Sequence, residues 1–245
     1  MKGLSGKTVL VTGGGGAIGS AICRRFAEAG SKVLVADRDK AAAEGTAGQL
    51  KGTALVFDIS DYQKARTAIG NTPIDILVNN AGWDRFQNFL DTKPEEWEQL
   101  IAINLRGPLN MHHLVAPGMA ARGWGRIVNI SSDAARVGSS GESVYSACKG
   151  GIVAFSKTLA RELARKGVTV NVVCPGPTDT PILRGFLGEG EAGQKVYDAL
   201  VRAIPMKRVG QPQDIAGIVT FLASEEAAFI TGQVISVSGG LTMAG

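Results

Sequence analysis

The segment Lys7–Gly30 reads KTVLVTGGGGAIGSAICRRFAEAG, and it determines the architecture predicted for the chain. It opens with the β-branched, apolar run Lys7–Thr12, which is typical of a buried strand. Apolar residues at helical spacing follow over Ile18–Ala29 and stop at Gly30, a residue suited to a helix C-terminus. Four consecutive glycines separate the two runs. The segment therefore predicts a strand, a glycine turn and a helix in direct succession.

The same alternation continues along the chain. Further strands are predicted at Lys32–Asp37, Ala54–Asp58, Ile74–Asn79, Arg126–Ile130, Thr169–Cys174 and Val234–Val237. Helices are predicted at Asp39–Leu50, after the cap Asp61, within Lys93–Met119 with Thr92 as its N-cap, at Ser143–Lys166 and at Gln213–Leu222. Strand–helix alternation gives parallel pairing through right-handed crossovers. We therefore expect an α/β fold, a Rossmann-like doubly wound parallel sheet of about seven strands with helices on both faces.

The composition fits one such domain spanning residues 1–245. Of the 245 residues, 44% are hydrophobic and only 6% aromatic, as expected for a helix-covered parallel sheet. The net charge is +4 and the basic residues are dispersed, which argues against nucleic-acid binding. No signal peptide or run long enough to span a bilayer is recognisable, and the three cysteines are isolated. We expect a reduced, cytoplasmic protein with no membrane contact.

One segment, Thr178–Arg202, interrupts the alternation. It is rich in Gly, Glu and small residues and follows a predicted strand. In open α/β sheets ligands bind beyond the carboxyl ends of the strands, so an insertion at this point is placed to cover them. We expect a substrate lid at about residues 178–205.

The glycine turn at Gly13–Gly19 predicts a dinucleotide site, because glycines there let backbone amides face a pyrophosphate at the start of a helix. A flexible turn is the alternative. Asp37 ends the second strand, where a carboxylate accepts hydrogen bonds from ribose hydroxyls and repels a 2′-phosphate. This favours NAD over NADP, although Arg38 could pair with a phosphate. Asp58 could accept from the adenine amino group.

Several motifs in order then resemble the short-chain dehydrogenase/reductase family over essentially the whole chain. They are the glycine turn, Asn79-Asn80-Ala81-Gly82, Asn104, Ser132, Tyr145-x-x-x-Lys149 and Pro175-Gly176. One position departs from the family pattern, because Ala17 replaces a glycine. The added methyl group would crowd the backbone near the cofactor, but alanine is small, so we expect cofactor binding and the fold to be kept, with the tightness of binding left open.

Tyr145 and Lys149 are four residues apart on a helix and share a face. An ordinary tyrosine has a pKa of about 10 and is a poor base at neutral pH. A nearby ammonium and a positively charged nicotinamide would lower that pKa, so that Tyr145 could take the proton of an alcohol. The resemblance implies that Lys149 also binds the nicotinamide ribose, that Ser132 binds the substrate oxygen, and that Asn104 holds a helix distortion with an ordered water. A half-buried tyrosine beside a solvated lysine is the structural alternative.

The motifs together predict two groups of ligand contacts. The cofactor-binding residues are Gly13, Gly16, Ala17, Ile18, Gly19, Asp37, Arg38, Asp58, Ile59, Asn80, Ala81, Gly82, Tyr145, Lys149, Pro175, Gly176, Thr178 and Thr180. The substrate-binding residues are Trp83, Arg136, Ser139, Glu142 and Phe186. Candidate partners for phosphate groups are Arg85, Arg136, Arg184, Lys207 and Arg208.

Three segments, Trp83–Asp84, Asp133–Glu142 and Val237–Met243, are similar to family members of alicyclic acid degradation. That resemblance implies NAD-dependent oxidation of a secondary alcohol in a β-hydroxyacyl-CoA, such as 2-hydroxycyclohexanecarboxyl-CoA, to the 2-keto thioester. The alternatives are a 3-oxoacyl-[acyl-carrier-protein] reductase, a dehydrogenase of free cyclic alcohols, and a non-catalytic binding subunit.

Two further expectations concern assembly and metals. The resemblance implies a homotetramer formed through the helices at Leu105–Met119 and Ile152–Leu163 and the C-terminal strand. No metal site is predicted, because no His, Cys and acidic residues have ligand spacing. The only histidines, His112 and His113, are adjacent and diverge around their helix, which favours a surface or interface role over catalysis.

Overall fold

Seven parallel strands form one sheet in the computed structural model, which describes residues 1–188 and 190–243. The strand order is β3-β2-β1-β4-β5-β6-β7. The strands are β1 (Thr8–Thr12), β2 (Lys32–Asp37), β3 (Thr53–Val56), β4 (Ile76–Asn79), β5 (Gly125–Ile130), β6 (Val168–Pro175) and β7 (Val234–Val237). The predicted fold class is confirmed. Residue 189 of the predicted lid and residues 244–245 of the predicted domain lie outside the described residues.

The central strands are apolar on both faces because both faces are covered by helices. Leu10 of β1 lies opposite Leu34 of β2 and Leu77 of β4. Every residue of β4 and β5 is buried. Burial on both faces explains why β4 begins with three successive apolar residues, Ile76–Val78, and does not alternate apolar with polar residues there.

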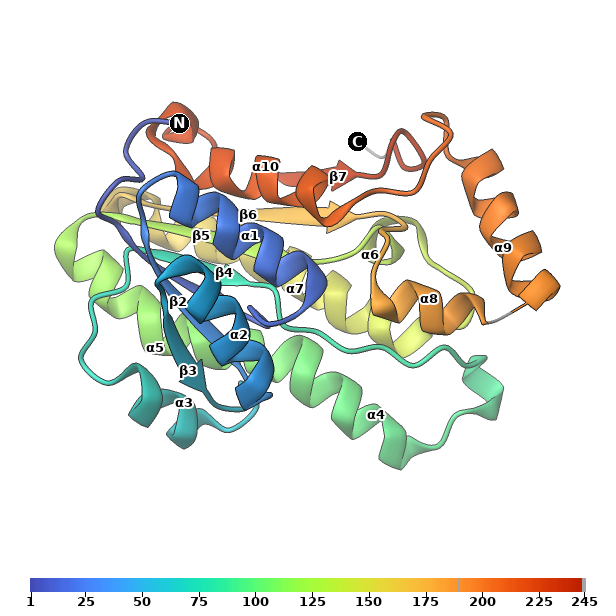
Figure 1. Ribbon diagram of the computed structural model, residues 1–245. Helices are drawn as coiled ribbons and strands as arrows, with labels where there is room; N and C mark the ends of the chain where they lie inside the picture. The colour runs from blue at the N-terminus through green and yellow to red at the C-terminus, as the bar shows by residue number, and fades with distance from the viewer. Residues whose placement is uncertain (189, 244–245) are drawn as a thin grey trace.

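Helices cover the two faces in separate layers (Figure 1). The α-helices of the described residues are α1 (Ala17–Glu28), α2 (Lys40–Leu50), α3 (Tyr62–Ile69), α4 (Pro94–Ile101), α5 (Gly107–Arg122), α6 (Ala134–Val137), α7 (Ser143–Leu163), α8 (Pro181–Leu187), α9 (Gly190–Ala203) and α10 (Pro212–Ala223), of which α8 and α9 do not cover a face. Phe26 of α1 and Val219 of α10 belong to the apolar cluster on one face. Met111 and Met119 of α5 belong to the cluster on the other.

Two helices begin after a capping side chain, at positions where the sequence predicts a helix to start. Asp39 and Asp61 accept from the backbone N–H groups of Ala42 and Lys64, and so begin α2 and α3. The predicted cap at Thr92 is wrong, because the helix starts one residue later with Lys93 as its N-cap. The Thr92 hydroxyl is used by its neighbours, since it donates to the Phe89 carbonyl and accepts from Trp97 Nε1.

The long helix predicted within Lys93–Met119 is interrupted. A π-helical turn at Ala102–Arg106 separates α4 from α5. Asn104 lies in this turn, and its Nδ2 donates to the Leu100 carbonyl at 3.1 Å. Such turns occur often at functional sites. The distortion expected at Asn104 is therefore present.

The predicted lid segment forms two helices, α8 and α9, beyond the carboxyl ends of the strands (Figure 1). The chain runs from β1 outward through β2 and β3 and then returns to β4 on the other side of β1. The order of the strands therefore reverses between β1 and β4, where open α/β sheets place their ligands. Among the described residues, no helix has the length and apolarity needed to span a membrane.

Candidate active site

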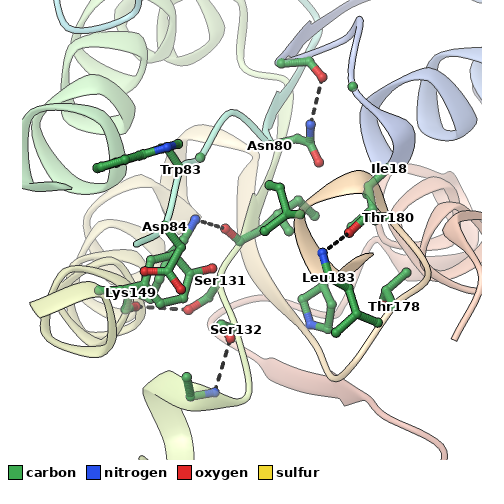
Figure 2. Close-up of a pocket in the computed structure, with 18 of the residues that line it drawn as sticks. Ile18, Asn80, Trp83, Asp84, Ser131, Ser132, Lys149, Thr178, Thr180 and Leu183 are labelled. Carbon is green, nitrogen blue, oxygen red and sulfur yellow. Dashed lines mark hydrogen bonds between the residues drawn. The ribbon is translucent and has the colours of Figure 1, made fainter. Parts of the chain in front are cut away.

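A cavity of about 950 Å³ opens at the carboxyl ends of the strands, at this reversal point. Its walls are the glycine turn, the residues after β2, β4 and β5, the first turns of α7, and α8. Figure 2 shows Asp84, Ser131, Ser132 and Lys149 on one side of the cavity and Thr178, Thr180 and Leu183 on the other. The predicted site residues are thus brought together from distant parts of the chain.

The glycine turn packs too closely for side chains. Gly13 has φ +63°, and a Cβ there would lie 2.8 Å from Ala81 Cα. A Cβ on Gly19 would lie 2.0 Å from the Gly13 carbonyl oxygen. Asn80 fixes the turn to the end of β4, because its Nδ2 donates to the carbonyls of Thr12 and Gly13 at 3.1 Å each (Figure 2). This bare backbone at the start of α1 fits a pyrophosphate.

Asp37 is held at the rim of the same cavity. Its Oδ2 accepts from the Gly15 N–H at 3.0 Å, and its Oδ1 accepts from the Asp39 N–H at 3.1 Å. These two bonds fix the carboxylate, and each oxygen keeps further acceptor capacity. Arg38 also lines the cavity. The carboxylate that favours NAD and the guanidinium that could pair with a 2′-phosphate are therefore both present in the lining.

Tyr145 and Lys149 come from one face of α7, as their spacing predicts. Lys149 Nζ lies 5.5 Å from the centre of the Tyr145 ring and donates to the Ile130 carbonyl at 3.1 Å. Ser132 follows β5, and its Oγ accepts from the Ala134 N–H at 3.2 Å. All three side chains line the cavity. A phenol, a hydroxyl and an ammonium therefore face one space, an arrangement suited to moving a proton to or from an oxygen.

Lys149 was expected to help lower the pKa of Tyr145, but the residues of the chain by themselves do not lower it. Burial raises the pKa of Tyr145, and the negative charges of Asp84 and Glu142 raise it further. A hydrogen bond with Ser132 opposes this rise. Lys149 is itself fully buried, and burial lowers its pKa to about 8. The phenol therefore keeps its proton at neutral pH, which is the form of a general acid.

Asn104 does not line the cavity. Its side chain pairs with the backbone of Trp83 in both directions: Oδ1 accepts from the Trp83 N–H at 3.2 Å, and Nδ2 donates to the Trp83 carbonyl at 2.6 Å. Trp83 does line the cavity. Asn104 is thus a positioning residue, because it fixes the loop that carries Trp83 and Asp84.

The remaining predicted residues fall on the cavity with one exception. All of the predicted cofactor-binding residues line it, as do Trp83, Ser139, Glu142 and Phe186. Arg136 does not, so the structure does not support its predicted place among the substrate-binding residues. The short helix α6, which the sequence did not predict, turns Arg136 away, and its guanidinium donates to Ser236 Oγ of β7 at 2.9 Å.

The other candidate phosphate partners also lie outside the cavity lining. Three of the arginines pair with nearby acids instead: Arg85 with Glu96 at 2.7 Å, Arg184 with Asp179 at 2.8 Å and Arg208 with Asp214 at 2.6 Å. Lys207 Nζ donates to the Arg202 carbonyl at 2.8 Å. Local partners engage these side chains, which weakens the prediction that they bind phosphates.

Some lining residues had no predicted role. One of them is Asp84, whose negative charge, like that of the predicted substrate residue Glu142, adds to the rise that burial causes in the pKa of Tyr145. Phe86 packs on Phe186 of the lid, with ring centres 3.9 Å apart. Leu200 of α9 also reaches the cavity. Leu200 follows Val196 by four residues, and this helical spacing could have indicated a helix within the predicted lid. The contact between Phe86 and Phe186 joins two distant loops and leaves no periodic pattern in the sequence.

The two histidines do diverge, but His112 is not a surface residue. It is 2% exposed, and burial lowers its pKa to about 4. Its Nδ1 lies 2.6 Å from the Pro108 carbonyl, and the neutral ring packs edge-on against Phe155. His113 bonds the Tyr62 hydroxyl at 2.8 Å. Neither lines the large cavity. Within residues 1–188 and 190–243, no three potential metal-ligating side chains come together.

Comparison with known proteins identifies the same scaffold. Residues 15–242 match the family model described as Enoyl-(Acyl carrier protein) reductase. Acetoacetyl-CoA reductase of Rhizobium meliloti (strain 1021) is 42% identical over 243 residues, which cover 96% of this chain and 98% of that protein. Two crystal structures of 3-oxoacyl-[acyl-carrier protein] reductases from Brucella melitensis also match. One has a TM-score of 0.90 at 35% identity, and the other, with bound NAD, has 0.89 at 34%.

Each of these structural matches covers 98% of this chain and 92% of the other. The similarity therefore includes the sheet, both helix layers and the lid segment. The chain belongs to the short-chain dehydrogenase/reductase family of oxidoreductases that use a nicotinamide cofactor.

Proposed function

We propose that this protein is an NAD(H)-dependent oxidoreductase that interconverts a 3-oxoacyl thioester and the corresponding 3-hydroxyacyl thioester. One observation carries the proposal: Tyr145, Ser132 and Lys149 line the same cavity as the glycine turn and Asp37. A proton donor and a dinucleotide cradle thus share one space. That combination serves hydride transfer, in which a carbonyl carbon gains a hydride and its oxygen gains a proton.

The chain's own groups favour the reductive direction. The nicotinamide supplies the hydride when it is bound. Tyr145 donates its proton to the oxygen of the carbonyl being reduced, and Ser132 hydrogen-bonds the same oxygen as charge develops on it. The phenol of Tyr145 holds its proton at neutral pH, which is the form needed to donate it. Oxidation of the alcohol needs the phenolate, so we expect it to be faster at higher pH.

Asp37 supports NAD as the cofactor. Its carboxylate is fixed by the N–H groups of Gly15 and Asp39 at the end of β2, where it can accept from ribose hydroxyls. Like charge would disfavour a 2′-phosphate there. Ala17 lies at the first position of α1 and lines the cavity, and its side chain adds only one methyl group there.

The relatives support a 3-oxoacyl thioester as the substrate, because acetoacetyl-CoA reductase and 3-oxoacyl-[acyl-carrier protein] reductase act on that chemical group, as their names state. They do not single out an alicyclic acyl group. The apolar lid residues Ile182, Leu183 and Phe186 would cover the acyl chain. We therefore rank reduction of a 3-oxoacyl thioester above oxidation of 2-hydroxycyclohexanecarboxyl-CoA, which was expected from the sequence.

We also propose a homotetramer. An apolar groove of about 660 Å³ lies over α5 and α7, the helices predicted to form contacts, and Leu109, Phe155 and Leu159 line it. A second copy would bury these side chains. Light scattering should then give four times the 25.5 kDa mass of one chain.

A steady-state assay tests the activity. Acetoacetyl-CoA, acetoacetyl-[acyl-carrier protein], 2-hydroxycyclohexanecarboxyl-CoA and free cyclohexanol are each offered with the matching form of NAD or NADP, and absorbance at 340 nm is followed. We expect NADH oxidation with at least one of the two 3-oxoacyl thioesters, well above the rate with NADPH. Turnover of the free alcohol with none of the thioesters would refute the proposal.

A further inference from the structure

Two phenylalanine rings meet where the lid approaches the loop after β4. Phe86 belongs to that loop and Phe186 to α8, and their ring centres lie 3.9 Å apart at an interplanar angle of 32°. Both side chains line the large cavity, and they are 43% and 41% exposed. The two rings therefore belong to the wall of the cavity and not to the apolar core of the protein.

Phe86 is held on the part of this wall that leads to Tyr145. The Gln87 N–H donates to the Gly141 carbonyl at 2.9 Å, and a Cβ on Gly141 would lie 3.0 Å from Phe86 Cδ1. The Phe86 ring thus packs closely on a glycine that has no side chain to displace it. Gly141 precedes Tyr145 by four residues, so the loop after β4 lies against the segment that enters the first turn of α7.

Phe186 forms the lid's side of the contact. None of the residues of α8 is buried, and the helix is started by its own cap, since Thr180 Oγ1 accepts from the Leu183 N–H at 3.3 Å (Figure 2). The ring contact with Phe86 links this exposed helix to the loop after β4. Removing either ring would therefore open this wall of the cavity without taking a side chain out of the core.

The order of the strands assigns the wall to the substrate half of the cavity. Asp37 and Asp58 follow β2 and β3, on one side of the point where the strand order reverses, and the adenosine of the cofactor would lie there. The loop of Phe86 follows β4, Ser132 follows β5 and the lid follows β6, all on the other side. The two rings thus face the half of the cavity in which the carbonyl would react.

A 3-oxoacyl thioester extends in two directions from its reacting carbonyl. The thioester arm is polar and continues into CoA or a carrier protein, so it must leave the cavity. The acyl arm is apolar, and Phe86, Ile182 and Phe186 offer it an apolar lining. We propose that the contact between Phe86 and Phe186 is the end wall of the acyl subsite and restricts the substrate to short acyl groups, because a longer chain must push the two rings apart. The inference rests on the proposed function and names the class of acyl group that the site accepts.

The test compares acetoacetyl-CoA with 3-oxooctanoyl-CoA, whose acyl arm is four carbons longer, both with NADH. The wild type should prefer acetoacetyl-CoA. Phe86→Ala and Phe186→Ala should each raise kcat/KM for 3-oxooctanoyl-CoA, relative to acetoacetyl-CoA, by about tenfold or more, since one methylene group in an apolar pocket changes kcat/KM by about 10- to 200-fold. Phe89→Ala is the matched control. Phe89 is an exposed ring between β4 and α4 that stacks on Trp97 and does not line the cavity, so its loss should leave the ratio unchanged.

A double variant distinguishes one shared wall from two independent contacts. Because either truncation alone opens the wall, Phe86→Ala combined with Phe186→Ala should raise the ratio by less than the product of the two single effects. An effect equal to that product would contradict a shared wall. NADH binding, followed by fluorescence, checks that the variants are folded, and the milder truncation Phe186→Leu should shift the ratio in the same direction.

The outcomes separate this inference from the proposed function. Unchanged ratios in the alanine variants, with acetoacetyl-CoA still reduced, would overturn the restriction and leave the proposed function intact. A wild type that reduces 3-oxooctanoyl-CoA as efficiently as acetoacetyl-CoA would do the same. Failure of the wild type with every thioester would overturn both.

Discussion

Replacing Asp37 by Asn should move the protein from NADH toward NADPH. The wild-type carboxylate is fixed by the Gly15 and Asp39 N–H groups and faces the cavity. The Asn amide keeps one acceptor oxygen but loses the charge. A hydrogen bond to a charged group contributes about 1.5–3 kcal/mol, so kcat/KM for NADH should fall by about 10- to 150-fold.

The gain with NADPH follows from removing repulsion. At a separation of roughly 5 Å and an effective dielectric constant of about 20, two unit charges of like sign repel by about 3 kcal/mol. Removing Asp37 should therefore raise kcat/KM for NADPH by about 100-fold. Arg38 lies at the same rim and could then pair with the 2′-phosphate.

Initial rates with the two cofactors and one fixed 3-oxoacyl thioester measure this shift. Asp39→Asn is the matched control, because Asp39 caps α2 and does not line the cavity. It should keep the helix cap, because Asn caps a helix about as well as Asp, and it should leave the cofactor ratio unchanged. A wild type that prefers NADPH, or an Asp37→Asn variant with an unchanged ratio, would refute the role given to this carboxylate.

Three further outcomes follow from the packing and the buried groups. Gly19→Ala should lower the unfolding free energy by about 1–3 kcal/mol and weaken NADH binding, because its Cβ would meet the Gly13 carbonyl. The control Gly48→Ala lies in open space on α2 and should not destabilise the protein. Urea unfolding and NADH titration check both variants. Asn104→Asp should lower kcat by about 10- to 100-fold, since an Asp carboxylate cannot donate to Trp83 and Leu100; an unchanged kcat would contradict its positioning role. The pKa of His112 is about 4 in the folded protein, against 6.5 for an ordinary histidine, so the buried ring is neutral. Its contribution to folding stability is therefore complete above pH 6.5. That contribution is lost as the pH falls toward 4, by up to about 1.4 kcal/mol per pH unit. Urea unfolding at pH 7 and 5 should show a smaller loss in His112→Asn than in the control His113→Asn, and equal losses would contradict this account.

The alternation of strands and helices was readable because both faces of the sheet are buried. Continuous apolar runs such as Val9–Val11 and Ile76–Val78 mark the strands, and helical spacing marks the covering helices. Motif order then placed Ser132, Tyr145 and Lys149 correctly, because strand ends of a parallel sheet meet at one edge whatever the intervening loops do. The glycine turn was readable for a related reason, since only a residue without Cβ fits at Gly13 and Gly19.

Interactions between distant loops could not be predicted from the sequence. Arg136 looked available in the sequence, but α6 and the Ser236 hydroxyl of β7, one hundred residues away, determine its direction. The pKa of Tyr145 is raised first by burial and then by the charge of Asp84, which lies 61 positions earlier in the chain and comes near Tyr145 only in the folded protein. His112 gave no signal of burial, because a histidine on a helix shows its environment only when the packing of Phe155 against it is known.

The central claim is that Tyr145 transfers the proton. Single-turnover reduction of acetoacetyl-CoA by NADH in Tyr145→Phe tests it most directly, because this change removes one hydroxyl and keeps the ring in place. The account predicts a rate lower by about 10²–10⁴-fold, with NADH affinity and unfolding free energy close to those of the wild type. A rate equal to that of the wild type would contradict it.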